Sequence, residues 1–294
     1  MLTGVRPGPL VGISYHAGIE QWTRDHLAHF DLLEITVDHC LDRGYASRLA
    51  IYDLVDRIPL TAHGVGLSIG TDAPLDERYL DQVAEIIQRL KATTYSEHLS
   101  FSAVPGRDLG IFLPVPKTEV VAASIITKVR KIQSRIPFPF LLENIAYLFD
   151  WPNSELSDAE FFNLICGETR AGLLLDIENL FLNSRNHGFD PYAFLDSLMP
   201  GIVNEVHLAG GITIEEQFLP RPYFADSHSH PVSDEVLDLL EYVLARQAPA
   251  NIIIEREGRL EAISELLDDV SRVRARIAKQ TRNTHGQPTF ASAD

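Results

Sequence analysis

The chain has 294 residues, 45% hydrophobic and 22% charged, a composition that excludes a disordered or fibrous protein. It carries 25 Lys and Arg against 41 Asp and Glu, and the resulting net charge of -16 favours solubility and disfavours binding to nucleic acid. Cys40 and Cys166 are too few and too far apart for a disulfide framework or a thiolate metal site. With no signal peptide and no membrane-spanning segment, we expect a cytoplasmic protein.

Short apolar runs recur eight times along the chain, and each is typical of a strand in a parallel sheet that is covered on both faces. The predicted strands are Leu10–Tyr15, Leu32–Val37, Leu60–His63, Tyr95–Phe101, Phe140–Glu143, Gly172–Asp176, Val203–Leu208 and Asn251–Glu255. Between them, helical spacing of apolar residues predicts helices over Asp81–Lys91, Glu119–Ile132 and Asp234–Arg246. Ser157, with Glu160 three residues later, predicts a capping box at the start of another helix.

This eightfold alternation of strand and helix predicts an α/β fold, a closed (β/α)8 TIM barrel. The rival fold, a doubly wound open sheet, usually has a Gly-rich turn after its first strand, whereas this first strand ends in Tyr15-His16-Ala17. We expect one catalytic domain over residues 1–280 and a disordered polar tail over 281–294. The stretches Ala103–Pro116 and Gly210–Pro231 follow strands, so we expect irregular loops there that form a lid or a substrate wall.

Potential metal ligands fall at the ends of consecutive predicted strands. The carboxyl ends of parallel barrel strands meet at one mouth, where several carboxylates and imidazoles are costly to bury unless cations neutralise them. Nitrogen and oxygen ligands alone exclude a thiolate zinc site and fit iron, manganese, zinc or magnesium. The set exceeds what one ion needs, so two or three ions with a bridging carboxylate are expected. The candidates are His63, His98, Glu143, Asp176, His207, Asp226, His228 and Glu255.

The other histidines fall outside this pattern. His230, next to His228, either orients a ligand, moves protons or is a solvated loop residue. His16 ends the first strand and has no assigned role. We expect ordinary surface positions for His26, His29, His39 and His285.

Several segments, in their order and spacing, resemble the multinuclear non-haem iron-dependent oxidase family, the MbnB-like enzymes that modify peptides. They are AHGVGLSIG, YSEHLSF, LLENIAY, LLLDIENLFLNSRNHGFDP, NEVHLAGG, DSHSHPV and IIIEREG. The resemblance implies a barrel of the xylose isomerase-like type. It also implies an O2-dependent oxidoreductase that holds two or three iron ions, mixed Fe(II) and Fe(III), and rearranges a cysteine. That cysteine belongs to a ribosomally synthesised precursor peptide, usually presented by a separate peptide-binding partner protein.

The resemblance also implies how the ligands are divided among ions. His63, His98 and Glu143 match one metal site, and Glu143, Asp176, His207 and Glu255 match a second that shares Glu143. Asp226 and His228 match a third, to which Glu178, Asn179 and His187 are further candidates. Where the family typically has Asp-Val-Asn-Asn, this chain has Asp176-Ile177-Glu178-Asn179, and its second strand (Glu34 to Asp38) lacks a Glu-Asn pair often found there. The third site and the substrate side of the site are therefore expected to differ.

Three other functions fit parts of this pattern. A zinc- or manganese-dependent sugar isomerase or epimerase would use the same barrel with a redox-silent metal. A metal-dependent phosphodiesterase acting on nucleic acid fits the ligands but conflicts with the acidic charge. A metal-storage role would leave open coordination positions unused.

Overall fold

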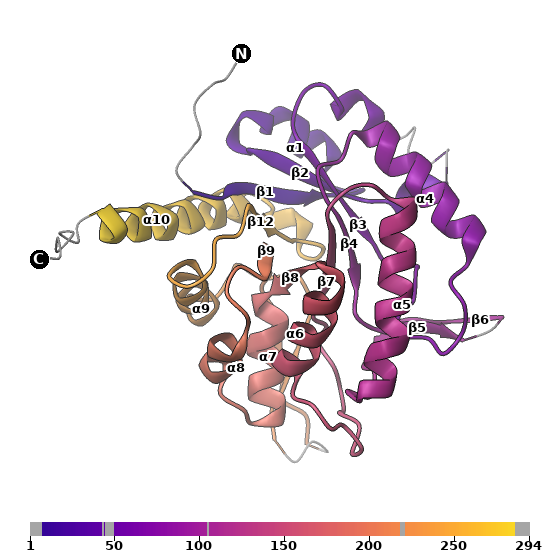
Figure 1. Ribbon diagram of the computed structural model, residues 1–294. Coiled ribbons are helices and arrows are strands. Elements are labelled where there is room, and N and C mark those ends of the chain that lie inside the picture. Colours follow the sequence, from indigo (N-terminus) through magenta and orange to yellow (C-terminus); the bar gives the residue numbers. More distant parts are fainter. Residues whose placement is uncertain (1–7, 43, 45–49, 105, 218–220, 286–294) are drawn as a thin grey trace, which may run out of the picture.

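The eight apolar runs form the strands of a closed parallel barrel, which confirms the predicted fold class (Figure 1). The computed structural model describes residues 8–42, 44, 50–104, 106–217 and 221–285. Around the barrel the strands follow in the order β1, β2, β3, β4, β7, β8, β9, β12, and β12 pairs with β1. Their bounds are Leu10–Tyr15 (β1), Leu32–Thr36 (β2), Leu60–Gly64 (β3), Tyr95–His98 (β4), Phe140–Glu143 (β7), Gly172–Asp176 (β8), Val203–Leu208 (β9) and Asn251–Ile254 (β12).

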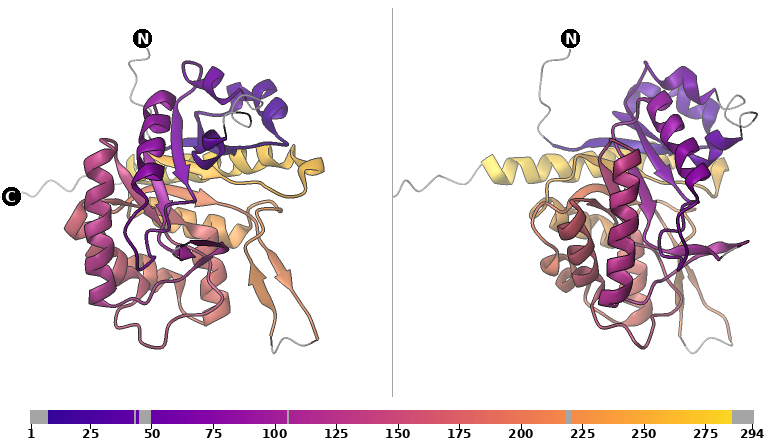
Figure 2. Two further views of the ribbon diagram at one scale, coloured as in Figure 1. Left: turned by 90° about the vertical axis from the view of Figure 1, so that its right-hand side faces the viewer. Right: turned by 45° about the vertical axis from the view of Figure 1, so that its right-hand side comes forward.

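Helices cover the outer face of the barrel, so the aliphatic strands are buried between them and the interior (Figures 1 and 2). This double burial is the physical reason that the strands read as continuous apolar runs rather than as alternating ones. The helices are α1 (Glu20–Asp25), α2 (Asp38–Leu41), α4 (Glu77–Leu90), α5 (Glu119–Arg135), α6 (Asp158–Thr169), α7 (Ile177–His187), α8 (Pro191–Ser197), α9 (Asp234–Leu244) and α10 (Glu265–His285), with short 3-10 turns at Leu27–His29, Ile51–Leu54 and Leu260–Ala262.

Local caps set the helix bounds. Asp76 accepts hydrogen bonds from the backbone N–H groups of Arg78 and Tyr79, so α4 begins before the predicted Asp81. The predicted capping box is confirmed, because the Ser157 hydroxyl accepts from the Glu160 N–H while the Glu160 carboxylate accepts from the Ser157 N–H.

Both loops that we predicted to be irregular contain a β-hairpin, so that prediction was wrong. β5 (Phe101–Val104) pairs with β6 (Arg107–Leu113), and β10 (Ile212–Ile214) pairs with β11 (Tyr223–Ala225). Their faces are largely solvent-accessible, so they lack the buried alternation that marks a strand in sequence, and a register shift interrupts β5 and β6. The predicted strand Tyr95–Phe101 is accordingly two strands, β4 and β5. Figure 2 shows both hairpins beside the barrel.

The C-terminal helix is longer than predicted. α10 continues to His285, so residues 281–285 are helical rather than part of a tail, and residues 286–294 lie outside the described part of the chain. Among the described residues, no helix combines the length and the apolar character needed to cross a bilayer.

Candidate metal centre

Ligand-type side chains from six barrel strands, from the residue that follows a seventh strand and from one loop converge at the carboxyl end of the barrel. They form four overlapping groups whose ligand atoms lie within 4.8 Å of one another. The groups are His63, His98 and Glu143; Glu143, Asp176 and His207; Asp176, His228 and Glu255; and Glu34, His207 and Glu255.

The first group places two imidazole nitrogens against one carboxylate oxygen. Nε2 of His63 lies 3.4 Å, and Nε2 of His98 3.3 Å, from Oε2 of Glu143. The His63 Nδ1 is 2.8 Å from the Ser96 hydroxyl, which itself donates to the Ala62 carbonyl, so this Nδ1 carries the proton. The His98 Nδ1 lies 3.3 Å from the Gly64 carbonyl, which accepts its proton in the same way. Both Nε2 atoms are then free to bind a metal ion.

The second group is built on His207, which is fully buried. Its Nε2 donates to Oε2 of Glu34 at 3.0 Å, and its Nδ1 lies 3.4 Å from Oε1 of Glu143 and 3.3 Å from Oε2 of Glu255. A carboxylate that accepts the proton of one ring nitrogen leaves the other nitrogen as a metal ligand. Glu143 therefore faces the first group with Oε2 and the second with Oε1, as a bridging carboxylate would.

The third group joins the hairpin loop to the barrel. Nε2 of His228 lies 2.8 Å from Oδ1 of Asp226 and 3.8 Å from Oε2 of Glu255. Asp176, at the end of β8, belongs to this group and to the second. Asp176 also caps α7, because its Oδ1 accepts from the Asn179 backbone N–H at 2.7 Å, which leaves Oδ2 directed away from the helix.

Unpaired polar atoms in these groups are suited to binding a cation. Among the described residues, buried polar atoms without a hydrogen-bond partner include Glu143 Oε2, Asp176 Oδ2, Asn179 Oδ1, His207 Nδ1 and His228 Nδ1. Each such atom costs free energy when it is buried alone. Burial lowers the pKa of His63 and of His98, so both rings are neutral, the form in which imidazole binds metals. These donors fit metal ions.

The further candidates fall into different places. Glu178 follows Asp176 and is buried, with Oε1 accepting from the Gly211 N–H and Oε2 unpaired. Burial raises the pKa of Glu178 to about 7. His187 is not in any of the four groups, since it stacks on Tyr147 and its Nε2 contacts the Tyr147 carbonyl at 3.0 Å. His230 is also outside the groups and contacts the Ser229 hydroxyl at 2.8 Å.

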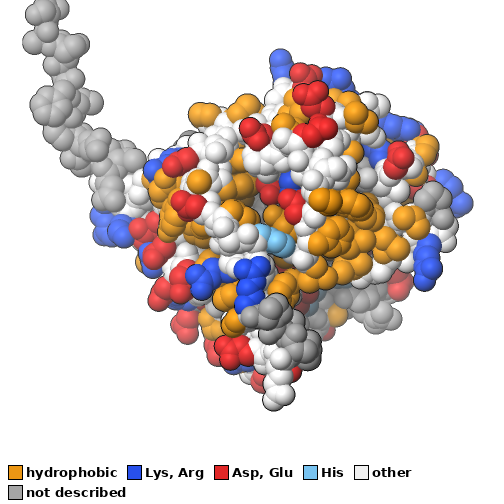
Figure 3. Space-filling model, turned by 90° about the horizontal axis from the view of Figure 1, so that it is seen from below, with side chains coloured by type: hydrophobic (Ala, Val, Ile, Leu, Met, Phe, Trp, Pro, Cys, Tyr) orange, Lys and Arg blue, Asp and Glu red, His pale blue; other side chains and the backbone are white. Residues whose placement is uncertain are grey.

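A cleft of about 320 Å³ opens above the groups. Phe112 of β6 lines it and stacks on His98 with ring centroids 3.9 Å apart. His16 and His39 also line the cleft, so the expectation that His39 is an ordinary surface residue was wrong. Figure 3 shows a histidine and acidic side chains at a hollow in the face drawn, with hydrophobic side chains along one side. We call this cleft the metal cleft. It exposes the ligand side chains to solvent.

Glu34 is the main residue of the cluster that the sequence did not identify. It lies inside β2, which pairs with β1 and with the ligand strand β3, and it is buried against His207 from across the barrel. The available signal was an acidic residue in an otherwise apolar strand, Leu32 to Thr36, where no solvent-facing position is expected.

Comparisons with known proteins agree with this geometry. A family model described as RiPP precursor modification enzyme MbnB/TglH/ChrH matches residues 10–278. A UPF0276 protein of Bordetella parapertussis is 33% identical over 246 residues, which cover 84% of this chain and 85% of the relative. A UPF0276 protein of Pasteurella multocida is 31% identical over 265 residues, with 83% and 85% covered.

Solved structures share the fold at low sequence identity. L-ribulose 3-epimerase has a TM-score of 0.61 at 15% identity, with 97% of this chain and 99% of that chain covered. A xylose isomerase domain protein from Planctomyces limnophilus also has a TM-score of 0.61, at 13% identity, with 94% and 100% covered. The barrel is therefore of the xylose isomerase-like type.

Proposed function

The chain belongs to the MbnB/TglH/ChrH family of RiPP precursor modification enzymes, and from this we propose that it is a multinuclear iron-dependent oxidase. In this proposal it uses O2 to modify a cysteine of a ribosomally synthesised precursor peptide. The membership itself indicates an enzyme that acts on a peptide. The metal, the oxidant and the reacting residue are the steps that we add.

The observation that carries the proposal is the arrangement of His63, His98 and Glu143. Two ring nitrogens without protons face one carboxylate oxygen at 3.4 and 3.3 Å, and no hydrogen is left to bridge either pair. Such an arrangement is repulsive unless a cation lies between the three atoms. Two imidazoles and one carboxylate are also the ligand set used by non-haem iron, which leaves positions open for other ligands.

We assign the ions to the groups described above. His63, His98 and Glu143 would hold one, and Glu143, Asp176, His207 and Glu255 a second. Asp226 and His228 would hold a third ion together with Asp176 and Glu255. Glu178 and Asn179 follow Asp176 closely in the chain, and their unpaired atoms Oε2 and Oδ1 are further candidate ligands for this third ion. Bound iron would supply Lewis acidity and electrons for a reaction with dioxygen.

The chain's own residues then orient and expose the reacting groups. Ser96, Gly64 and Glu34 each accept the outer proton of one ligand histidine and so fix its ring orientation. The open metal cleft admits a peptide side chain, and a soft cysteine thiolate is the ligand type that the protein does not itself provide there, since Cys40 and Cys166 are buried elsewhere.

The substrate proposal includes a partner protein. Within the described residues the metal cleft is lined mainly by ligands and their neighbours, which leaves little surface to read a peptide sequence. We propose that a peptide-binding partner, and the hairpins β5–β6 and β10–β11, supply recognition. We further propose one catalytic barrel domain through α10 and a cytoplasmic location, where two free thiols stay reduced.

The test begins with metal and oxygen. Protein purified without oxygen should hold at least two iron ions per chain, and it should consume O2 when the precursor peptide is added. Peptide mass, followed with and without the partner, should change for the cysteine peptide and not for its Cys→Ser form. Stoichiometric zinc with full activity and no gain from ferrous iron would rule the proposal out.

A zinc- or manganese-dependent sugar isomerase or epimerase is the second candidate. It is favoured by the group Glu143, Asp176 and His207, which with Glu255 would suffice for a single ion, and by the shared barrel. This candidate predicts one redox-silent ion per chain, turnover of a free sugar and no need for oxygen. The same metal count and oxygen-uptake measurement separate the two.

A further inference from the structure

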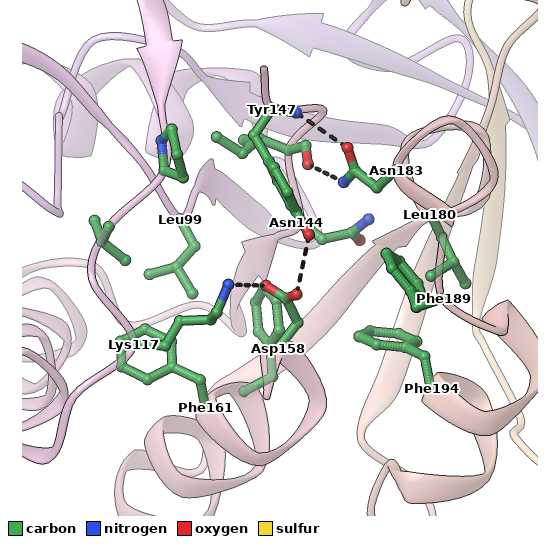
Figure 4. A pocket seen from close by; sticks show the side chains of 14 residues that line it. Leu99, Lys117, Asn144, Tyr147, Asp158, Phe161, Leu180, Asn183, Phe189 and Phe194 are labelled. Atoms are coloured by element: carbon green, nitrogen blue, oxygen red, sulfur yellow. Dashed lines mark hydrogen bonds and ion pairs between the residues drawn. The ribbon is translucent and has the colours of Figure 1, made fainter. Parts of the chain in front are cut away.

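A second hollow is lined by residues that follow β4 and β7, and Figure 4 shows it from close by. Its volume is about 40 Å³, which exceeds the roughly 10–15 Å³ that one small molecule the size of water needs. We call it the inner cavity. Aromatic and aliphatic side chains form most of its wall, among them Leu99, Phe161, Leu180, Phe189 and Phe194.

The inner cavity and the metal cleft are built on consecutive residues. Leu99 follows the ligand His98, and Asn144 follows the ligand Glu143. In both segments the ligand lines the metal cleft and the next residue lines the inner cavity. The Leu99 N–H donates to the Glu143 carbonyl at 2.8 Å and holds the two segments together. Ile145 lines both hollows, and its side chain is therefore part of the wall between them.

The polar side chains in the wall of the inner cavity are all paired with protein atoms. Lys117 Nζ donates to both oxygens of Asp150 at 2.7 Å and lies 3.3 Å from Oδ1 of Asp158, whose Oδ2 accepts from the Tyr147 hydroxyl. The Asn144 amide exchanges two hydrogen bonds with the Asp176 backbone.

The Asn183 amide completes this pairing, since it accepts from the Tyr147 N–H and donates to the Ile145 carbonyl. Figure 4 shows several of these bonds along the cavity wall. Within the described chain, none of the unpaired buried side-chain atoms belongs to a residue that lines the inner cavity. A buried water is held by two to four polar partners, so a wall whose polar atoms are already paired holds water less firmly than one with unpaired atoms.

We propose that the inner cavity binds dioxygen and passes it to the metal cleft past Ile145. The inference rests on the proposed function, which requires O2 at the ligands of β4 and β7. Its chemical basis is that a mostly apolar cavity without unpaired polar atoms favours a small apolar molecule, as xenon uptake by apolar cavities shows. The cavity is a hollow separate from the metal cleft, so oxygen held there could reach the ligands while a peptide fills the cleft.

Xenon is the probe, because its uptake does not depend on iron or turnover. Crystals of the iron-loaded protein pressurised with xenon should show one xenon atom among Leu99, Phe161 and Leu180. Leu180→Phe should fill the space and abolish that xenon site, whereas Leu180→Met, which conserves volume, should retain it.

Oxygen kinetics then test the role. With the iron-loaded enzyme and saturating peptide, Leu180→Phe should raise KM for O2 several-fold and leave kcat at saturating O2 unchanged, while Leu180→Met changes neither. If Leu180→Phe does not fold, its circular dichroism and iron content will show it. Phe194→Trp, which enlarges a second residue of the cavity wall, would then be used in place of Leu180→Phe.

Each other outcome overturns part of the scheme. Ordered water in place of xenon, or xenon binding with an unchanged KM for O2 in the filled variant, would overturn the oxygen-binding role. Xenon binding in a protein that holds no iron and consumes no oxygen would instead overturn the proposed function. It would also rule out dioxygen as the occupant, although the cavity would still bind a small apolar molecule.

Discussion

The metal cleft and the inner cavity are two hollows separated by a single step along β4 and β7, yet their polar groups are arranged in opposite ways. Around the inner cavity, Lys117 faces two aspartates and each amide has its partners within the chain. Around the metal cleft, carboxylates and imidazoles face one another, those of His63 and His98 neutral, and Glu143 Oε2 and Asp176 Oδ2 have no hydrogen-bond partner.

The difference teaches that buried charge alone does not identify a functional site. Lys117 and Glu143 are both buried, but Lys117 faces two aspartates, whereas the one imidazole with a raised pKa beside Glu143, His207, is shared with the carboxylates of Glu34 and Glu255. A buried ion without a compensating charge is too costly to persist unless something from outside compensates it. The missing positive charge at the metal cleft is thus the evidence for a ligand, and the complete pairing at the inner cavity is the evidence against a polar one.

The largest expected effect comes from removing the charge that two groups share. In Glu143→Gln, an amide replaces the carboxylate that faces both groups, so more than one iron ion per chain should be lost, and activity with them. His228→Ala should lose about one ion, and His230→Ala, whose ring lies outside the groups, should lose none. Metal counts on folded, anaerobically purified variants decide this. Equal single-ion losses in the first two would remove Glu143 from the bridging role.

A smaller effect is expected from Glu178 in metal-free protein. Burial raises its pKa to about 7, so the folded chain binds its proton more tightly than the unfolded chain does. The free energy of unfolding should therefore fall as pH rises from the ordinary carboxyl pKa to about 7, and this loss should persist above pH 7.

Glu178→Gln removes that titration and keeps an oxygen for the Gly211 N–H. The variant should be more stable than the natural chain by about 3 kcal/mol at a pH of about 8 and equal to it at a pH of about 4. Denaturant unfolding of chelated protein across this range is the measurement, with Glu216→Gln at an exposed position as control. Parallel stability curves for the two variants would contradict the prediction.

The orientation of His207 gives the next effect. Glu34→Leu removes the acceptor of the Nε2 proton, so affinity for the ion at His207 should fall by roughly 10–100-fold. Glu34→Gln retains an acceptor oxygen and should lose less. Titration against a competing chelator without oxygen measures both. An unchanged affinity in Glu34→Leu would show that Glu34 does not position the ring.

The smallest effect should arise at the inner cavity. Lys117→Met keeps the apolar stem but leaves Asp150 and Asp158 without their cation. Because both aspartates are partly exposed and can be rehydrated, the loss in stability should be only about 1–2 kcal/mol, below the cost of breaking a fully buried pair. Iron content should not change. Lys131→Met, at a half-exposed ion pair, is the matched control. A loss of iron in Lys117→Met would show that the two hollows are not independent.

The sequence predicted the barrel because strands buried on both faces produce continuous apolar runs, and the run Gly172–Asp176 was placed without error. It placed potential ligands together because parallel strands share one open end. It missed the hairpins β5–β6 and β10–β11, whose exposed strands depend on pairing rather than on burial.

Glu34 and the inner cavity were missed for another reason. The role of Glu34 depends on which nitrogen of His207 faces it across the barrel, a contact between residues 173 positions apart. The inner cavity depends on how Phe189, Phe194 and Leu180 pack, and sequence periodicity does not report voids. His187 shows the converse, since the motif that contains it suggested a ligand while its ring stacks on Tyr147 instead.

Asp176 gives the metal centre a mechanical connection to the rest of the protein. One of its oxygens caps α7 and the other is free for a metal ion, so a single carboxylate is shared between a helix terminus and the cluster. Metal binding would restrict the carboxylate rotation that lets the first turn of α7 fray. Amide hydrogen exchange at Asn179 should therefore slow when the ion is present, which would make the start of this helix a reporter of metal occupancy.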